Sequence, residues 1–493
     1  MTIRDLGIIP IPFVFTLVLI IYLVLVMYLG KISYDRSKSL NEFFVMGGAA
    51  GMIMGGIGYF ATQYSMSTFQ GVPGTIYTVG WPGLAVSVPT ASFSLLVPAF
   101  LVGSKLMKLG HKYGYLTMAD YLEDRFQSKA LRGLSALFTL LFLIPFLGAQ
   151  TIGAGAIVNT FTGAPFWVGV VIMGIGVTIY CGLGGIRGAM YTNILQGILM
   201  VITAISLFFA AIHLGGGLSA VNQRLLAADA GAFRFPGSPN AWLVYGNYFS
   251  QLVLWNFFTI GQPQLATKFF LMKNNKALYG SMIAAGVGMF LSTFFIYSTG
   301  VIARDVLPGV PRNLIDWVVP AIAAKTLPAV FASILMGGIL AAGMSTIDSV
   351  VVVVGGALSR DIYQKLINPK ASDEDVLKLS RICVVLVGCL ATLLGIARPA
   401  SIFQIVLFTF AGLGIQAIVM ILGVRWKRAN WQGATAGLLV GLISVIYFAT
   451  HPQILPGWNA ALPGGLACLI VMVIVSLLTS PTPEDVIKRH FTL

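Results

Sequence analysis

A short polar stretch at residues 337–349 (GGILAAGMSTIDS) lies inside a long apolar run of the chain. Its oxygen-bearing side chains are those of Ser345, Thr346, Asp348 and Ser349. Residues three or four apart share one face of a helix, so Ala342, Ser345 and Asp348 fall on a single stripe. A carboxylate inside a membrane is costly and by default marks a functional site. The stretch therefore predicts a site for an ion or a proton; the alternative is a helix interface whose hydroxyls bond to their own backbone.

The composition of the chain indicates whether this stretch lies in water or in a membrane. Of 493 residues, 57% are hydrophobic and only 9% are charged, whereas soluble domains carry about a quarter charged residues. Long apolar runs recur from end to end, which predicts an all-α polytopic membrane protein in contact with lipid. The net charge of +14 then belongs to loops on one side of the membrane, and we expect no nucleic-acid partner.

Hydropathy and helix breakers predict thirteen membrane spans. They lie near 10–30, 48–76, 82–106, 130–160, 165–186, 189–214, 242–271, 277–303, 327–358, 377–397, 401–424, 432–450 and 462–480. With the N-terminus outside, most of the 30 basic residues, Lys268 among them, fall on the cytoplasmic side. The positive-inside rule therefore predicts a plasma (inner) membrane protein with a cytoplasmic C-terminus.

The positions of the acidic residues argue against an enzyme. Apart from Asp348, every acid is expected in a loop or at a helix end, and no carboxylate pair or His and Cys cluster is expected at membrane depth. Catalysis would need such groups. A channel would need polar stripes along a whole pore, and a transporter-like membrane sensor would need a signalling domain, for which the tail after residue 480 is too short. A transporter is the favoured class.

Two of the predicted spans carry interruptions typical of transporter helices that unwind near the membrane midplane. The first lies in residues 55–77, whose polar centre ends at Gly71 and Pro73; the second lies in residues 255–269, around Pro263. They begin the second and seventh spans, so the same number of spans follows each break within its half. This arrangement indicates an inverted five-plus-five repeat, with plain helix kinks as the alternative.

Six motifs together resemble those of the sodium:solute symporter family across essentially the whole chain. They are ATQYSMSTFQGVPG (61–74), ADYLEDRF (119–126), GLGGIRGAMYTNILQG (182–197), GQPQLATKF (261–269), ILAAGMSTIDS (339–349) and SRDIY (359–363). The segment GAQTIGAGAI (148–157) is similar to the pantothenate and monocarboxylate branch.

The resemblance implies a LeuT-like inverted repeat in a single transmembrane domain spanning residues 1–493. Its parts would be an extra N-terminal helix at 10–47, a first repeat at 48–214, a second repeat at 242–424 and two C-terminal helices at 432–480.

The resemblance also implies a sodium site between the first broken helix and the eighth core helix. Its ligands would be the backbone carbonyls of Ala61, Tyr64 and Ala342 and the hydroxyls of Ser345 and Thr346. The chemistry agrees, because Na⁺ prefers oxygen ligands and an unwound backbone supplies carbonyls without helical partners.

One position departs from the family pattern. The family usually has an aspartate where this chain has Asn193, and in some members that aspartate and two hydroxyls form a second sodium site. Positions 348 and 349 match those hydroxyls, so Asp348 and Ser349 stand opposite Asn193. A relocated charge, a proton site and the loss of a second ion all remain open.

The resemblance places the solute cavity beside the two breaks. The candidate solute contacts are Gln63, Ser67, Gln70, Gln150, Trp255, Phe258, Thr259 and Gln262. The pantothenate-like branch implies a small carboxylate; because no Lys or Arg is expected in the cavity, helix N-termini and amides would hold it.

We expect a symporter that couples Na⁺ entry to the import of a small organic solute by alternating access. A proton-coupled symporter that uses Asp348, a carrier of a neutral solute such as a sugar, and a membrane sensor remain alternatives. Both a monomer and a homo-oligomer are compatible with the sequence.

Overall fold

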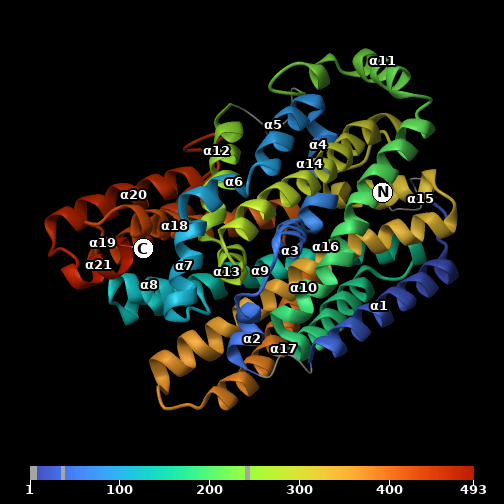
Figure 1. The fold of residues 1–493 in the computed structure, drawn as a ribbon. Helices are drawn as coiled ribbons and strands as arrows, with labels where there is room; N and C mark the ends of the chain where they lie inside the picture. The colour runs from blue at the N-terminus through green and yellow to red at the C-terminus, as the bar shows by residue number, and fades with distance from the viewer. Residues whose placement is uncertain (1–7, 35–38, 239–244, 493) are drawn as a thin grey trace.

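The computed structural model describes residues 8–34, 39–238 and 245–492, and this part of the chain is a bundle of helices (Figure 1). Among these residues, nine helical segments are long and apolar enough to cross a membrane. They are Trp81–Tyr113, Lys129–Thr162, Thr192–Leu214, Asn275–Val306, Ala329–Ile367, Asp373–Ala397, Ile402–Arg425, Trp431–Thr450 and Ala461–Leu478. The prediction of an all-α polytopic membrane protein is therefore confirmed. The nine helical segments found among the described residues are fewer than the thirteen predicted spans.

Four of the predicted spans are absent from these nine. The apolar helices Pro12–Tyr28 and Phe166–Ile179 are too short to be counted, and the other two spans are broken helices. The first consists of α3 (Met52–Gln63) and α4 (Val72–Val79), with a short π-helical segment, η3 (Ser67–Gly71), between them. The second consists of α12 (Tyr245–Asn256) and α13 (Pro263–Leu271). Each piece is too short to cross a membrane by itself.

The two predicted spans at 165–186 and 189–214 belong to one continuous helix of 49 residues, α10 (Phe166–Leu214). A straight helix of this length would measure roughly 70 Å, more than twice the apolar thickness of a bilayer. The expected break in helical structure near residue 187 is therefore not seen.

The first interruption lies at Tyr64 and Ser65, upstream of the glycine and proline that predict it. Tyr64 has extended backbone angles (φ −88°, ψ 122°) and caps α3. Gly71 and Pro73 instead lie within helical segments, where Pro73 occupies the first turn of α4 and needs no N–H partner.

In the second broken helix, Gln262 is extended, and Pro263 follows as the first residue of α13. The break therefore lies where the sequence places it.

The helix α9 (Lys129–Thr162) defines two ends of the bundle. Its 34 residues span roughly 50 Å. Near its start it packs against α8 (Met118–Phe126), and near its finish Asn159 accepts a 3.3 Å hydrogen bond from Trp317 of η7 (Arg312–Trp317). We call these the Lys129 end and the Asn159 end.

The remaining long helices surround this axis. They are α1 (Pro12–Tyr34), α5 (Trp81–Ser92), α7 (Ser104–Tyr113), α14 (Asn275–Val306), α16 (Ala329–Gly356), α17 (Asp373–Ala397), α18 (Ile402–Arg425), α19 (Trp431–Thr450) and α20 (Ala461–Leu478). A π-helical segment, η8 (Ala357–Ile367), continues α16. Figure 1 shows α19 and α20 along one edge of the bundle and α1 along the opposite edge. The helices near the two ends of the chain thus flank a core that contains α3, α9 and α16.

The start of α8 is determined by its local sequence. Thr117 is its N-cap, and the Thr117 side chain and the Asp120 carboxylate each bond the other residue's backbone N–H. This capping box fixes the start of the helix. The side chains of Tyr121, Arg125 and Phe126 on this helix are buried against the bundle.

Candidate functional site

The five predicted sodium ligands lie together between the first broken helix and α16. Ser345 Oγ lies 2.7 Å from the carbonyl oxygen of Ala61 and 3.0 Å from that of Ala342. Thr346 Oγ1 lies 3.0 Å from the carbonyl oxygen of Ala342 and 3.3 Å from that of Tyr64. All five residues are buried. The oxygens therefore form one compact, neutral cluster.

The local structure explains why these oxygens converge. The last carbonyls of α3 have no helical partner because the chain becomes extended at Tyr64. The hydroxyls of Ser345 and Thr346, on α16, donate hydrogen bonds to these carbonyls. Side chains of another helix therefore replace the helical partners that the carbonyls lack at the break. An ion that replaces these hydroxyl contacts would find oxygens on both helices.

One turn further along α16, Asp348 and Ser349 lie in a second polar cluster. Ser349 Oγ is 3.1 Å from Asp348 Oδ1 and 3.0 Å from Thr62 Oγ1. Thr192 Oγ1 is 3.3 Å from Asp348 Oδ2, and Asn193 Nδ2 is 3.4 Å from Thr62 Oγ1. The structure therefore brings Asn193, Asp348 and Ser349 together as expected.

Lys268 is the residue of this cluster that the sequence misplaces. The sequence groups it with the cytoplasmic lysines, but in the structure its side chain is only 1% exposed and its Nζ lies 3.3 Å from Ser349 Oγ. It sits one turn before the end of α13, and its long side chain points back into the bundle. Hydropathy locates a residue along a span but cannot give the direction of its side chain.

Asp348 is also not the only buried acid. Asp316 and Asp361 are 0% and 3% exposed, but they lie at the Asn159 end and the Lys129 end, where arginines accompany them. The sequence underestimates how far helix ends are covered by neighbouring segments.

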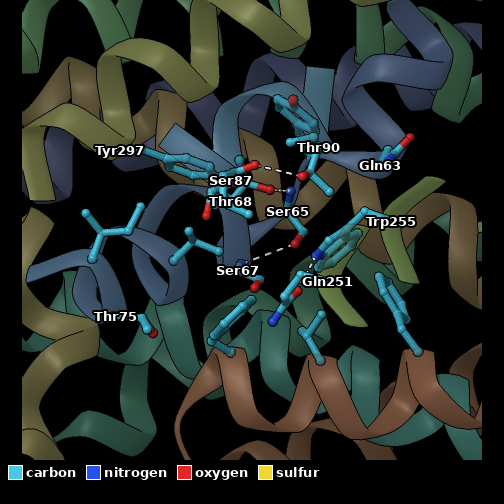
Figure 2. Close-up of a pocket in the computed structure, with 18 of the residues that line it drawn as sticks. Gln63, Ser65, Ser67, Thr68, Thr75, Ser87, Thr90, Gln251, Trp255 and Tyr297 are labelled. Atoms are coloured by element: carbon cyan, nitrogen blue, oxygen red, sulfur yellow. Dashed lines mark hydrogen bonds between the residues drawn. The ribbon is translucent and has the colours of Figure 1, made fainter. Parts of the chain in front are cut away.

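A separate cavity lies beside the first break, on its Asn159 side (Figure 2). Its polar lining consists of Gln63, Ser65, Ser67, Thr68, Thr75, Ser87, Thr90 and Gln251, and its aromatic lining of Tyr64, Tyr248, Trp255, Tyr297, Phe403 and Phe410. None of these lining residues carries a formal charge. The centre of a water molecule can move through about 50 Å³ of it, which is room for a few water molecules.

Three polar atoms of this cavity are buried without a hydrogen-bond partner among the described residues: Ser67 Oγ, Gln63 Oε1 and Gln251 Nε2. The orientation of the Gln251 amide is determined by Trp255, whose Nε1 can only donate and lies 2.7 Å from Gln251 Oε1. The NH₂ group of Gln251 is therefore the part without a partner. Buried polar atoms nearly always have a hydrogen-bond partner, so these three atoms are candidates to bond a solute or ordered water in the cavity.

Of the eight predicted solute contacts, Gln63, Ser67 and Trp255 line the cavity. Gln150 and Gln70 instead join the broken helix to α9, through bonds to the Met66 N–H (3.0 Å) and the Gly153 carbonyl (3.3 Å). They support the backbone beside the cavity and do not line it.

The other three predicted contacts have packing positions. Phe258 packs closely against Gly414 and Gly465, Thr259 Oγ1 lies 3.5 Å from the Ser94 carbonyl, and Gln262 accepts a 3.1 Å bond from Gln264. These residues lie in the break itself, between α12 and α13, and they do not line the cavity.

The sequence misses most of the cavity wall. Ser87 and Thr90 come from α5 and Tyr297 from α14, and isolated residues of these types carry no signal in a membrane helix. Gln251 could have been predicted from the sequence, because it lies one helical turn before the predicted contact Trp255, on the same face of α12.

A wider vestibule of about 620 Å³ opens at the Asn159 end. Its polar lining consists of Thr78, Arg312, Asn313, Arg398, Ser401 and Gln404. Thr75 and Phe403 line both the vestibule and the cavity, so they form the wall between them. The cavity thus lies directly behind a basic entrance.

Asp316 lies beneath this entrance. Its Oδ2 is 3.8 Å from Arg398 Nη2 and accepts a 3.3 Å bond from the Ile402 N–H. Burial raises the pKa of Asp316 to about 6, although Arg398 counteracts this effect. The carboxyl group therefore titrates near neutral pH.

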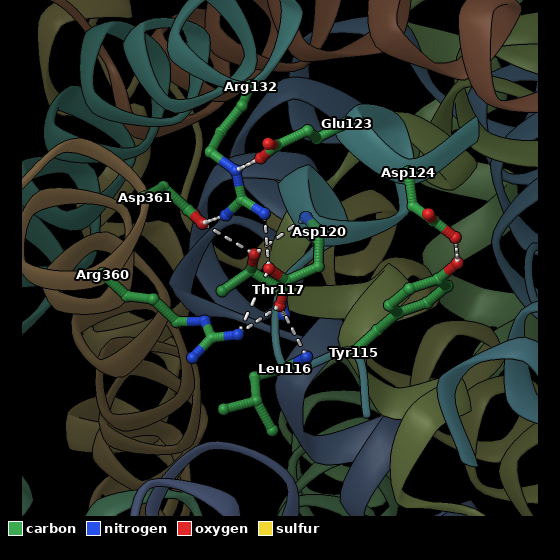
Figure 3. A network of polar contacts seen from close by, with 9 residues as sticks. All are labelled: Tyr115, Leu116, Thr117, Asp120, Glu123, Asp124, Arg132, Arg360 and Asp361. Carbon is green, nitrogen blue, oxygen red and sulfur yellow. Dashed lines mark hydrogen bonds and ion pairs between the residues drawn. The ribbon is translucent and has the colours of Figure 1, made fainter. Parts of the chain in front are cut away.

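At the Lys129 end, a buried ion-pair cluster joins α8, α9 and η8 (Figure 3). Arg132 contacts Asp120 at 2.6 Å, Asp361 at 2.5 Å and also Glu123, and Arg360 contacts Asp120 at 3.2 Å. Burial opposes the ionisation of Asp120, but the two arginines hold its pKa below the ordinary value. The cluster holds three segments in one arrangement.

The model of the sodium:solute symporter family matches residues 43–441 of this chain. The sodium/pantothenate symporter of Escherichia coli (strain K12) is 28% identical, over 90% of this chain and 92% of the relative. The high-affinity proline transporter PutP of Bacillus subtilis (strain 168) is 26% identical, over 94% of this chain and 98% of the relative.

Two solved structures share the fold. The outward-open, substrate-bound state of a Na⁺-coupled sialic acid symporter matches 96% of this chain and 99% of its own, with a TM-score of 0.81 at 22% identity. Mhp1, a nucleobase-cation-symport-1 family transporter, matches 93% of this chain and 99% of its own, with a TM-score of 0.58 at 12% identity. These likenesses agree with the predicted LeuT-like fold.

Proposed function

The chain belongs to the sodium:solute symporter family, and we propose that it imports a small carboxylate together with a sodium ion held between α3 and α16. Membership makes it a Na⁺-coupled solute symporter and not an enzyme, and a multi-pass membrane protein. The solute, the ion ligands, the orientation in a plasma membrane and the count of thirteen crossings are the parts proposed here.

The compact oxygen cluster supports the sodium site. Ala61, Tyr64 and Ala342 would bind the ion through backbone carbonyls, and Ser345 and Thr346 through their hydroxyls. A neutral set of oxygens suits a monovalent cation that must be released again. Because the ligands come from two helices, a bound ion favours the arrangement in which α3 and α16 are in contact.

The proposal that the solute is a carboxylate rests on one observation: the cavity contains two buried hydrogen-bond donors without partners among the described residues. The Ser67 hydroxyl and the Gln251 NH₂ group both present hydrogens that a carboxylate accepts. At the start of the helical segment that follows the break, the Met66 and Ser67 N–H groups are already bonded to the side chains of Gln150 and Ser65, so only the helix dipole favours an anion there. Arg312 and Arg398 in the vestibule would attract an anion toward the cavity.

The named solutes of the relatives support the same class. Pantothenate, proline and sialic acid are all carboxylic acids, although they differ in size and in the rest of their structure. The unpartnered Gln63 Oε1 would then accept a hydrogen bond from a hydroxyl or amine of the solute. A neutral sugar would leave the donor pair without its preferred acceptor.

The two broken helices support the repeat boundaries at 48–214 and 242–424, because each begins its half. Residues 10–47 and 432–480 then form the added helices at the two edges. With the N-terminus outside, the Asn159 end faces outward, so the vestibule receives solute and the ion-pair cluster closes the cytoplasmic end.

Thermal unfolding of the purified protein tests the proposal with matched solutes. Pantothenate and proline would be compared with panthenol and prolinamide, which lack the carboxylate, in sodium and in potassium buffer. We expect one acid to raise the unfolding temperature in sodium only; a solute at a hundred times its Kd stabilises by about 2.7 kcal/mol. Equal effects of acid and neutral analogue would refute the carboxylate, and equal effects in potassium would refute sodium coupling. Stabilisation that follows pH without sodium would favour the proton-coupled alternative.

A substitution at the donor pair gives a second test. Gln251→Glu keeps the shape of the side chain but replaces its NH₂ donor with a negative oxygen, so acid-dependent stabilisation should be lost. Gln223→Glu makes the same change on the exposed face of α11 (Leu218–Ala228) and should leave it intact. Unchanged binding in Gln251→Glu would place the carboxylate elsewhere.

A further inference from the structure

Lys268 is a fully buried lysine that belongs neither to the proposed sodium ligands nor to the lining of the solute cavity. Its Nζ lies 3.3 Å from Ser349 Oγ and 3.6 Å from Met190 Sδ. Lysine is almost never fully buried without a counter-charge, and the Asp348 carboxylate is near enough to interact with it electrostatically. The ammonium group is therefore held at the second polar cluster.

The second cluster has the composition of a cation site. Its core is the Asp348 carboxylate, with the hydroxyls of Ser349, Thr62 and Thr192 around it. Asn193 joins through Thr62, and its Oδ1 is buried without a hydrogen-bond partner in the described structure. A carboxylate and several neutral oxygens, none of them on a surface, are a set that stabilises a positive charge.

We propose that the Lys268 ammonium group is a tethered cation that takes the place of a second sodium ion in this cluster. The inference rests on the proposed function, which assigns one sodium ion to the neighbouring oxygens of Ser345 and Thr346. A sodium ion added beside the ammonium group would bring two positive charges together in a buried site, where their repulsion is weakly screened. The transporter therefore binds one sodium ion per cycle.

A covalently attached cation differs from a bound ion in that it links the cluster permanently to one helix. A bound ion leaves when the site opens, whereas Lys268 is covalently attached and stays with α13. Lys268 bonds to Ser349, one helical turn from Ser345 on α16, and Ser349 in turn contacts Thr62 at the end of α3. The ammonium group thus joins the second broken helix to the first and to α16 without drawing on the sodium gradient.

Equilibrium binding of ²²Na⁺ to the purified full-length protein counts the ions directly. We expect one ion per wild-type protein, lost in Ser345→Ala. In Lys268→Met the cluster keeps its oxygens without the tethered charge, so we expect two ions, and one again when Asp348→Asn is added. Lys273→Met, a change to an exposed lysine just after α13, should remain at one.

Several outcomes separate the two proposals. Two ions in the wild-type protein would overturn the tethered cation, as would a single ion in a folded Lys268→Met protein. Lys268→Gln keeps a hydrogen-bond donor for Ser349 and serves if the methionine variant does not fold; it too should bind two ions. A wild-type protein that binds no sodium would refute the proposed sodium site itself.

Discussion

Thr346→Val is the most direct perturbation of the proposed sodium site. Valine has nearly the shape of threonine, so the packing of α16 is kept and only the hydroxyl is lost. That hydroxyl lies 3.0 Å from the Ala342 carbonyl and 3.3 Å from the Tyr64 carbonyl, at the centre of the five oxygens. The substitution therefore removes one ligand without opening a cavity.

The expected loss of sodium affinity follows from the type of contact removed. A hydrogen-bonding group that interacts with a charge contributes roughly 1.5–3 kcal/mol. Each 1.4 kcal/mol corresponds to about a factor of ten, so the half-saturating sodium concentration should rise roughly 10- to 100-fold. The free energy of unfolding without sodium should also fall, by roughly 1–3 kcal/mol, because the buried Tyr64 carbonyl loses a hydrogen-bond partner. The sodium affinity is separated from this loss because each variant is compared with itself at different sodium concentrations.

A sodium titration of the unfolding temperature measures this shift at constant ionic strength, with potassium as the replacement ion. Ser333→Ala is the matched control, because Ser333 lies buried on the same helix and bonds only to the Ala329 carbonyl (2.7 Å) in the described structure. It should stay within about twofold of the wild type, well under the 1.4 kcal/mol of a tenfold change. A Thr346→Val protein that also stays in that range would show that this oxygen cluster does not hold the ion.

Three further substitutions test other parts of the structure. Arg132→Met removes the ion-pair partner of the buried Asp361 carboxylate and leaves Asp120 with Arg360 alone, which should cost roughly 3–5 kcal/mol of stability, seen as a lower unfolding temperature, whereas Lys129→Met on the exposed start of α9 should not. Because burial raises the pKa of Asp316 to about 6, the folded protein holds a proton that the unfolded chain releases, so this residue favours folding more as the pH falls from 7 to 5; Asp316→Asn should reduce that change in unfolding temperature. In Gly261→Ala the new Cβ would lie 2.4 Å from a backbone oxygen of α18, and we expect a loss of roughly 1–3 kcal/mol, in contrast to Gly337→Ala, whose Cβ meets nothing within 4 Å.

The sequence predicts those features of the fold that depend on local chemistry. The break before Pro263 is found where its residue types place it. The first break lies instead at Tyr64, because the hydroxyls of a distant helix satisfy its carbonyls there. An interruption that depends on a tertiary partner leaves no glycine or proline to find.

The site shows the same division. The five sodium candidates follow from a motif and lie together, whereas the cavity wall depends on which faces of five separate helices meet: the first broken helix, α5, α12, α14 and α18. Gln70 and Gln150 are polar residues near the break and are natural candidates, yet both bond to backbone groups. The inward direction of Lys268 could not be predicted, because a long side chain near a helix end can point to either side of it.

The break at Tyr64 also bears on how such a protein changes over evolution. Three of the five proposed ion ligands are backbone carbonyls, so a substitution at Ala61, Tyr64 or Ala342 alters a side chain and leaves the oxygen in place. The solute cavity is lined by side chains, and each can be replaced by mutation. A lineage can therefore exchange one solute for another while its dependence on sodium is inherited through the main chain.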